Sequence, residues 1–298
     1  MKLIDGRQIA KKIEETIAQE IHNLPGRKPG LAFLRIGEDP SSKVYIKIKK
    51  KKCEQVGILS FDKELPATAT SQEVIDTLHI LNEDPRIDGI LMQLPLPSHL
   101  SPFSLIEHIL PSKDVDGFHP MNMGKLLLGE TGGFIPCTPQ GVHRLLIDSH
   151  IEIPGKHVVI VGRSNIVGKP LAALLMQKDP LCNATVTVAH SQSLNLASLC
   201  KEADILIAAI GQPEWITKDM IAPGAVVIDV GISKKIEQDG SSHLVGDVDF
   251  KNVASLCSHI TPVPGGVGPM TVALLLQNTL KAYKNFSLLN RKFIQQFP

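Results

Sequence analysis

The stretch VVIVGRSNIVGKP, residues 158–170, decides the fold. A short apolar run reaches Gly162, a polar loop follows, and Gly168 precedes the helical run PLAALLMQK. Strand, glycine loop and helix in this order are typical of dinucleotide-binding folds. There, glycines admit a pyrophosphate and the helix N-terminus favours its negative charge. The spacing is not GxGxxG, because Ser164 stands at the second glycine position, so a simple tight turn is the competing interpretation.

Similar apolar runs recur on both sides of this stretch and predict an α/β fold with parallel sheets. Strands are expected at 31–37, 87–97, 157–162, 185–190, 204–211 and 225–231, and helices at about 41–57, 72–83, 140–149 and 268–286. The second-half runs each end in a polar or glycine loop, where open α/β sheets bind ligands. We expect a first domain over residues 1–139, a Rossmann-like nucleotide domain over 140–267, and residues 268–298 returning to the first domain.

The bulk composition limits the classes of function. The 298 residues carry 31 Lys plus Arg against 30 Asp plus Glu, so the net charge of +1 does not favour nucleic-acid or membrane binding. The five cysteines have no spacing typical of a disulfide framework or a zinc site, and no metal is expected. The N-terminus lacks the apolar core of a signal peptide, and we expect a cytoplasmic protein.

The strand after the glycine loop indicates which dinucleotide binds. NAD sites place an acid at its end to bind the ribose 2′-hydroxyl. Here the run TVTVAHSQS ends in His190 and Ser191, and Arg163 projects from the first loop. These side chains suit a 2′-phosphate and favour NADP, although Arg163 could be a surface residue and His190 a capping residue.

The segment KVYIKIKKKKCEQVGI, residues 43–58, raises the question of which lysine is functional. On a helical wheel the apolar side chains occupy one arc, and Lys43, Lys47, Lys50 and Lys51 occupy the opposite, solvated one. Lys49 and Lys52 fall inside the apolar arc, where a lysine is poorly solvated and suited to proton transfer. Lys49 also lies one turn after Tyr45. Either lysine could instead extend its ammonium to water, and the wheel does not choose between them.

Several motifs together resemble one family over nearly the whole chain. They are YIKIK, DGILMQLPLP, PSKDVDGFHP, FIPCTPQGV, VGRSNIVGKP, GAVVIDVGI, VGDVDF and ITPVPGGVGPMTVALL. The set resembles the bifunctional methylenetetrahydrofolate dehydrogenase/methenyltetrahydrofolate cyclohydrolase family. The resemblance implies NADP-dependent oxidation of 5,10-methylenetetrahydrofolate and hydrolysis of the methenyl product to 10-formyltetrahydrofolate. It also implies a homodimer, and a role in one-carbon metabolism that serves purine, methionine and histidine biosynthesis.

The resemblance also implies roles for individual residues. Tyr45 and Lys49 match the tyrosine and catalytic lysine, Gln93 matches the glutamine that assists that lysine, and Asp116 matches the aspartate that anchors the pterin ring. Positions matching NADP contacts are Gly162, Arg163, Ser164, Ser191 and Ile232, to which the loop reasoning adds Gly168 and His190. Positions matching a folate-site loop are Pro264, Gly265 and Gly266. The match at Lys49 favours it over Lys52.

Three alternatives stay open on the sequence. The chain could be a monofunctional methylenetetrahydrofolate dehydrogenase, or another NADP-linked two-domain dehydrogenase acting on a shikimate-like or amino-acid substrate. It could also be a non-catalytic nucleotide-binding protein. This last alternative predicts loss of Lys49, Gln93 or Asp116, and all three are present.

Overall fold

The computed structural model describes residues 1–236 and 240–296, apart from the side chains of Ser41 and of residues 287–296. The chain folds into two compact units, which are described separately. The three-stranded unit contains residues 12–125, 131–135 and 272–296, and the six-stranded unit contains residues 1–11, 126–130 and the described part of 136–271. Both units combine parallel strands with helices, so the chain has the two-domain α/β fold expected from its sequence.

The three-stranded unit is built on a parallel sheet with the order β3-β2-β4. The central strand β2 (Gly30–Ile36) is buried along its whole length. The edge strand β3 (Leu59–Leu65) is mostly exposed, and β4 (Gly89–Met92) is buried. A strand buried on both faces has a continuous apolar sequence. This explains why β2 and β4 are visible in the sequence and β3 is not.

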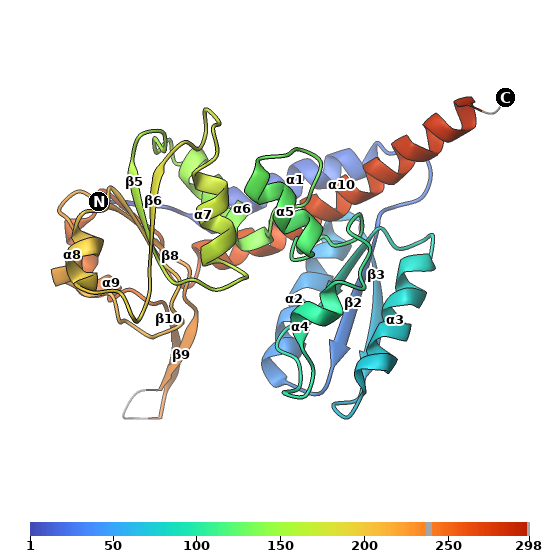
Figure 1. Cartoon of the computed structure of the whole chain (residues 1–298), viewed down its shortest axis with the longest axis horizontal. Coiled ribbons are helices and arrows are strands. Elements are labelled where there is room, and N and C mark those ends of the chain that lie inside the picture. The colour runs from blue at the N-terminus through green and yellow to red at the C-terminus, as the bar shows by residue number, and fades with distance from the viewer. Residues whose placement is uncertain (237–239, 297–298) are drawn as a thin grey trace. The chain divides into compact units, whose positions relative to one another are not determined.

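Helices cover this sheet on both sides, with α2 and α3 flanking the strands in Figure 1. α3 (Ser71–Glu83) and α4 (Pro102–Ile106) pack on one face, where Leu78 shares a buried cluster with Leu34. Thr70 fixes the start of α3 by a reciprocal capping box with Glu73. The other helices with residues in this unit are α1 (Gly6–His22), α2 (Pro40–Val56), α5 (Pro120–Leu128) and α10 (Val267–Gln296).

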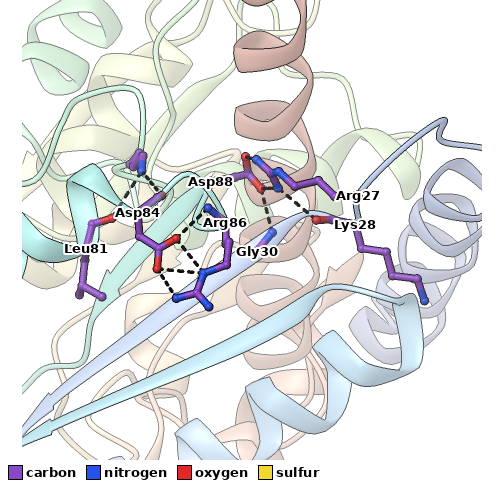
Figure 2. A network of polar contacts seen from close by, with 8 residues as sticks. Arg27, Lys28, Gly30, Leu81, Asp84, Arg86 and Asp88 are labelled. Atoms are coloured by element: carbon purple, nitrogen blue, oxygen red, sulfur yellow. Dashed lines mark hydrogen bonds and ion pairs between the residues drawn. The ribbon is translucent and has the colours of Figure 1, made fainter.

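A buried carboxylate anchors the amino ends of β2 and β4 (Figure 2). Asp88, just before β4, accepts two hydrogen bonds of 2.6 Å from the Arg27 guanidinium and one of 2.8 Å from the backbone N–H of Gly30. Lys113 donates to the carbonyl oxygens of Asn82 and Asp84 at the end of α3. These contacts hold the amino ends of the strands, at the end of the sheet opposite to the one where Gln93 follows β4.

The six-stranded unit has the strand order β1-β11-β8-β7-β5-β6, with every pair parallel. Its strands are β1 (Lys2–Leu3), β5 (His157–Val161), β6 (Thr185–Ala189), β7 (Ile205–Ala208), β8 (Val226–Asp229) and β11 (His259–Ile260). The central strands β5, β7 and β8 are buried except at His157. A separate antiparallel hairpin joins β9 (Ser233–Ile236) to β10 (Ser242–Val245).

Helices complete this unit and position its loops. They are α6 (Cys137–Asp148), α7 (Gly168–Leu175), α8 (Leu196–Lys201) and α9 (Phe250–Val253), with 3-10 turns η1 (Lys218–Met220) and η2 (Ala254–Leu256). One face of the sheet packs in a cluster that joins Val159 and Leu206 to Val253 of α9. No helix among the described residues is long and apolar enough to cross a bilayer.

The structure departs from the sequence expectations in several places. The strand expected at 87–97 ends at Met92, because Pro95 and Pro97 cannot donate to a ladder. The strand β3 and the β9–β10 hairpin were not expected at all. Residues 1–11 lie in the six-stranded unit, although the sequence places them in the first domain, because β1 pairs with β11.

Candidate functional site

Gln93 lies at the carboxyl end of β4, where its backbone N–H still pairs with the carbonyl oxygen of Leu34 at 2.8 Å. Both polar atoms of its side-chain amide form hydrogen bonds. Oε1 accepts a 3.0 Å hydrogen bond from Lys49 Nζ, and Nε2 donates to the Leu94 carbonyl oxygen at 2.6 Å. Two residues 44 positions apart in the sequence thus form one polar pair.

The helix α2 presents Lys49 to this strand end. Asp39 caps the helix by accepting from Ser42 N–H at 2.7 Å, Pro40 occupies its first turn, and Gly57 ends it in the left-handed conformation. Ser42 Oγ lies 3.4 Å from the Leu94 carbonyl oxygen, so the start of the helix also contacts the loop after β4. The helix start and the strand end are therefore linked at Ser42 as well as at Lys49.

The other lysines of α2 have different environments. Lys52, the second residue inside the expected apolar arc, pairs with Glu14 of α1 at 2.6 Å. Lys50, expected to be solvated, pairs with Asp62 of β3. Lys49 is half-buried and directed at Gln93, and this contact separates it from Lys52.

The prediction of a buried apolar face on α2 is wrong for the first half of the helix. Val44 is 59% exposed and Tyr45 is 42% exposed, whereas Cys53 and Val56 are buried. The second half of α2 supplies the buried contacts, so the face around Tyr45 and Lys49 stays open. Burial raises the pKa of the Cys53 thiol to about 11, which leaves that neighbour of Lys49 in its unreactive thiol form.

The two aspartates of the DVDG motif have separate environments. Asp114 is 2% exposed, and its carboxylate accepts from the backbone N–H groups of Gly117, Phe118 and His119 and from the Asn122 amide. Burial raises its pKa despite these donors. Asp114 thus closes the turn that carries Asp116.

Asp116 is half-buried in the turn that Asp114 closes. Asp114 pairs in parallel with Ile90 of β4, so the chain through Asp116 runs toward the same sheet edge as Gln93. The turn is held from α10 as well, because Asn278 Nδ2 donates to the Val115 carbonyl oxygen at 2.9 Å. The expected pterin anchor is therefore on a fixed turn at the edge that carries Gln93.

In the six-stranded unit, glycines make the close backbone packing expected of a nucleotide loop. A Cβ on Gly162 would lie 2.1 Å from the Ala209 carbonyl oxygen, and a Cβ on Gly168 would lie 2.0 Å from the Gly162 carbonyl oxygen. Gly162 also has a φ of 129°, which favours glycine. Together β5, the loop and α7 form the strand–glycine loop–helix cradle that suits a dinucleotide pyrophosphate.

The parallel pairing of β5 with β6 places the other residues predicted to contact the cofactor at the same end of the sheet. Gly162 N–H donates to the Ala189 carbonyl oxygen at 2.8 Å, so the loop after β5 starts beside the one after β6. Arg163 and Ser191 are exposed there. Ser164 Oγ accepts from Val167 N–H at 3.1 Å and shapes the loop.

His190 has a local structural role at this edge. Its Nδ1 accepts from Gln192 N–H at 3.2 Å, which matches the capping interpretation. Its backbone N–H donates to Ser193 Oγ at 2.9 Å. Contact with a cofactor stays a prediction for this residue.

The other predicted contacts also lie in this unit. Ile232 follows β8 and is 40% exposed. The 264–266 loop packs on the start of α1, where a Cβ on Gly6 would lie 1.8 Å from the Gly266 carbonyl oxygen, and Arg7 N–H donates to the Gly265 carbonyl oxygen at 3.2 Å. The predicted role of Pro264, Gly265 and Gly266 toward folate stays a prediction.

Sequence reasoning missed two buried aspartates in this unit. Asp229 ends β8 and Asp247 lies after β10, and they are 4% and 0% exposed. The sequence does carry a signal for them, since each acid lies next to, or two residues from, a glycine in VIDVG and VGDVD. Within the described residues, no group of three or more His, Cys, Asp or Glu side chains could hold a metal ion.

Known proteins match the chain over nearly its full length. The tetrahydrofolate dehydrogenase/cyclohydrolase catalytic domain matches residues 4–116, and the NAD(P)-binding domain of the same family matches residues 136–287. The bifunctional protein FolD of Protochlamydia amoebophila is 53% identical over 290 residues, which cover 97% of this chain and 99% of the relative.

Solved structures agree with these sequence matches. The bifunctional FolD methylenetetrahydrofolate dehydrogenase/cyclohydrolase of Campylobacter jejuni has a TM-score of 0.90 and 44% identity, covering 96% of this chain and 99% of that one. The Trypanosoma brucei enzyme, solved with NADP cofactor and inhibitor, has a TM-score of 0.89 and 38% identity, covering 96% and 98%. The chain therefore belongs to the tetrahydrofolate dehydrogenase/cyclohydrolase family.

Proposed function

We propose that the chain oxidises 5,10-methylenetetrahydrofolate with NADP⁺ and hydrolyses the resulting methenyl compound to 10-formyltetrahydrofolate, with Lys49 as the proton-transfer group of the second step. The bifunctional relatives and the two matched domains support both activities. The contact between Lys49 Nζ and Gln93 Oε1 at 3.0 Å supports the assignment of the lysine.

The loop after β5 would hold the cofactor. Gly162 and Gly168 let the loop pack closely against the neighbouring backbone, and the N-terminal end of α7 favours the negative charge of the pyrophosphate. Arg163 and Ser191 are exposed at this edge and would bind the 2′-phosphate, since a guanidinium can bind phosphate in bidentate fashion. When bound, NADP⁺ accepts a hydride. The chain's contribution to that step is to position the folate and exclude water.

The cyclohydrolase step needs a group that exchanges protons with the attacking water. Gln93 Oε1 holds Lys49 Nζ, and its own Nε2 is fixed by the Leu94 carbonyl oxygen. The amide thereby orients the lysine before substrate arrives. Tyr45, one turn earlier on α2 and exposed, is placed to contact substrate on the same face of the helix.

Asp116 would anchor the pterin. A carboxylate can accept two N–H bonds from the aminopyrimidinone edge of the ring. Its turn is fixed by the buried carboxylate of Asp114 and by Asn278, so the anchor does not have to be ordered when folate binds.

The decisive experiment replaces Lys49 by Met and follows both reactions separately. We expect decay of supplied methenyltetrahydrofolate to fall to its uncatalysed rate, whereas NADP⁺ reduction with methylenetetrahydrofolate falls much less. Lys51→Met is the matched control, because Lys51 is exposed on the same helix. A Lys49→Met enzyme with full cyclohydrolase activity would refute the assignment, and a wild-type enzyme without either reaction would refute the function.

We further propose a cytoplasmic homodimer. The five cysteines are all free and buried, as expected in a reducing compartment. The dimer follows from the family resemblance, which places its interface on the nucleotide unit. Sedimentation at several protein concentrations would test it, and a single monomeric species at micromolar concentration would contradict it.

A further inference from the structure

Asp247 is fully buried and uses one carboxylate oxygen to hold a single loop. Its Oδ2 accepts from Ile210 N–H at 2.6 Å and from Gly211 N–H at 3.0 Å. Its Oδ1 is buried and has no hydrogen-bond partner among the described residues. A buried carboxylate is costly to maintain, so its contact with the loop after β7 needs an explanation beyond packing.

A second buried carboxylate holds Asp247 in place. Asp229 accepts from the backbone N–H groups of Asp247 and Val248, both at 2.9 Å, and from Gly231 N–H at 3.0 Å. The fit is close. A Cβ on Gly231 would lie 2.2 Å from Asp247 Oδ1, and one on Gly246 would lie 1.9 Å from Asp229 Oδ2. The two carboxylates thus fix the loops that follow β7 and β8.

The loop after β7 lies next to the nucleotide loop. Ala209 N–H donates to the Val161 carbonyl oxygen at 2.8 Å, and the Ala209 carbonyl oxygen lies against Gly162 so closely that no Cβ would fit. The residues that Asp247 holds, Ile210 and Gly211, follow Ala209 directly. A shift of this loop would therefore displace the backbone that supports Gly162.

We propose that Asp247 is a positioning residue for the dehydrogenase reaction, which fixes the loop after β7 beside the nucleotide loop and thereby sets the affinity for NADP. This inference rests on the proposed function, because it requires that NADP bind at the Gly162 loop. Asp247 acts through Ile210 and Gly211 rather than by touching the cofactor.

Two substitutions at one position test this role. Asp247→Ala removes the acceptor for both N–H groups, whereas Asp247→Asn keeps one acceptor oxygen in a side chain of the same shape. We expect Asp247→Ala to raise both the dissociation constant and the KM for NADP⁺ roughly 10-fold. The KM for folate and the cyclohydrolase rate should be unchanged, and Asp247→Asn should restore NADP⁺ binding to within about threefold. Asp249→Ala, which removes the cap of α9, is the control from the same segment.

The outcomes separate this inference from the proposed function. Wild-type affinity for NADP⁺ in Asp247→Ala overturns the inference and leaves the function intact. An equal loss of both activities together with a lower melting temperature also overturns it, because the residue would then be only structural. Lack of NADP⁺ reduction by the wild-type enzyme would instead refute the proposed function.

Hydrogen exchange on the wild-type enzyme provides a test that does not depend on a folded variant. The amides of Ile210 and Gly211 should be protected before NADP⁺ is added, since Asp247 already binds them. Fast exchange that slows only on NADP⁺ addition would overturn the proposal, because the cofactor would then order the loop itself.

Discussion

Lys49 Nζ donates to Gln93 Oε1 at 3.0 Å, and the Gln93 amide nitrogen in turn donates to the Leu94 carbonyl oxygen. The lysine therefore has a neutral acceptor whose orientation is set by the backbone. A neutral acceptor orients the lysine without fixing its charge, which a carboxylate at the same place would do. The choice of an amide at position 93 suits a lysine that must gain and lose a proton.

Gln93→Glu should consequently lower the cyclohydrolase rate at least 10-fold while the protein stays folded. The carboxylate would hold the Lys49 ammonium in its charged form, and this removes its capacity to accept a proton from water. Decay of methenyltetrahydrofolate measures the effect. Gln55→Glu, an exposed site on α2, is the control for the charge change. An undiminished rate in Gln93→Glu would show that the amide is not needed for proton transfer.

Arg163→Ala should discriminate between the two dinucleotides. Arg163 is exposed at the edge where β5 and β6 end, and its guanidinium would pair with the 2′-phosphate that NAD⁺ lacks. We expect the KM for NADP⁺ to rise about 10-fold and the KM for NAD⁺ to change by less than about twofold. Arg144→Ala, which removes an exposed pair with Asp148, is the control. Equal increases for both dinucleotides would place Arg163 at the pyrophosphate instead.

The central strands β5, β7 and β8 of the six-stranded sheet were predictable because they are buried on both faces and therefore have continuous apolar sequences, whereas the two-residue strands β1 and β11 were not predicted. The edge strand β3 alternates with polar residues in LSFDKEL and gives no such signal. Its existence depends on pairing with β2, whose sequence does not reveal which neighbour it will have.

Helix geometry alone could not distinguish the role of Lys49 from that of Lys52, because the side chains that bind them lie far away in the sequence. Glu14, 38 residues before Lys52, binds that lysine, and Gln93, 44 residues after Lys49, binds the other. Only the family resemblance pointed to Lys49. The Asp229 and Asp247 pair was missed for the same reason, since 18 residues separate the two.

Asp88→Ala should destabilise the three-stranded unit without changing the chemistry. Asp88 has a side chain that is 2% exposed and binds Arg27 and the Gly30 N–H at the amino edge of the sheet (Figure 2). Because Arg27 is partly exposed and can recover solvent, we expect a loss of about 2 kcal/mol in unfolding free energy. Urea denaturation, monitored by a signal from the three-stranded unit, measures this loss of unfolding free energy. Asp62→Ala, which removes an exposed pair with Lys50, should change stability by less than about 0.5 kcal/mol. A similar small effect at Asp88 would contradict the anchoring role of its carboxylate.

Asp229 should titrate near neutral pH. Burial raises the pKa of this carboxyl from 3.8 to about 7, with a smaller contribution from the charge of Asp247, against the backbone N–H groups that lower it. Between pH 4 and 7 the folded state then holds a proton that the unfolded state has lost. This group's contribution to the unfolding free energy therefore falls as pH rises through that range and is constant above it.

Carbon-13 NMR of the aspartate carboxyls measures this titration directly, with Asp229→Asn identifying the resonance. We expect a midpoint near 7 in the wild type and a lower midpoint in Asp247→Asn, because that substitution removes the like charge. A midpoint near 4 in the wild type would mean that the three backbone N–H donors to Asp229 offset the effect of its burial. A midpoint unchanged in Asp247→Asn would mean that burial alone raises it, and that the two carboxylates are joined through the backbone without an appreciable interaction between their charges.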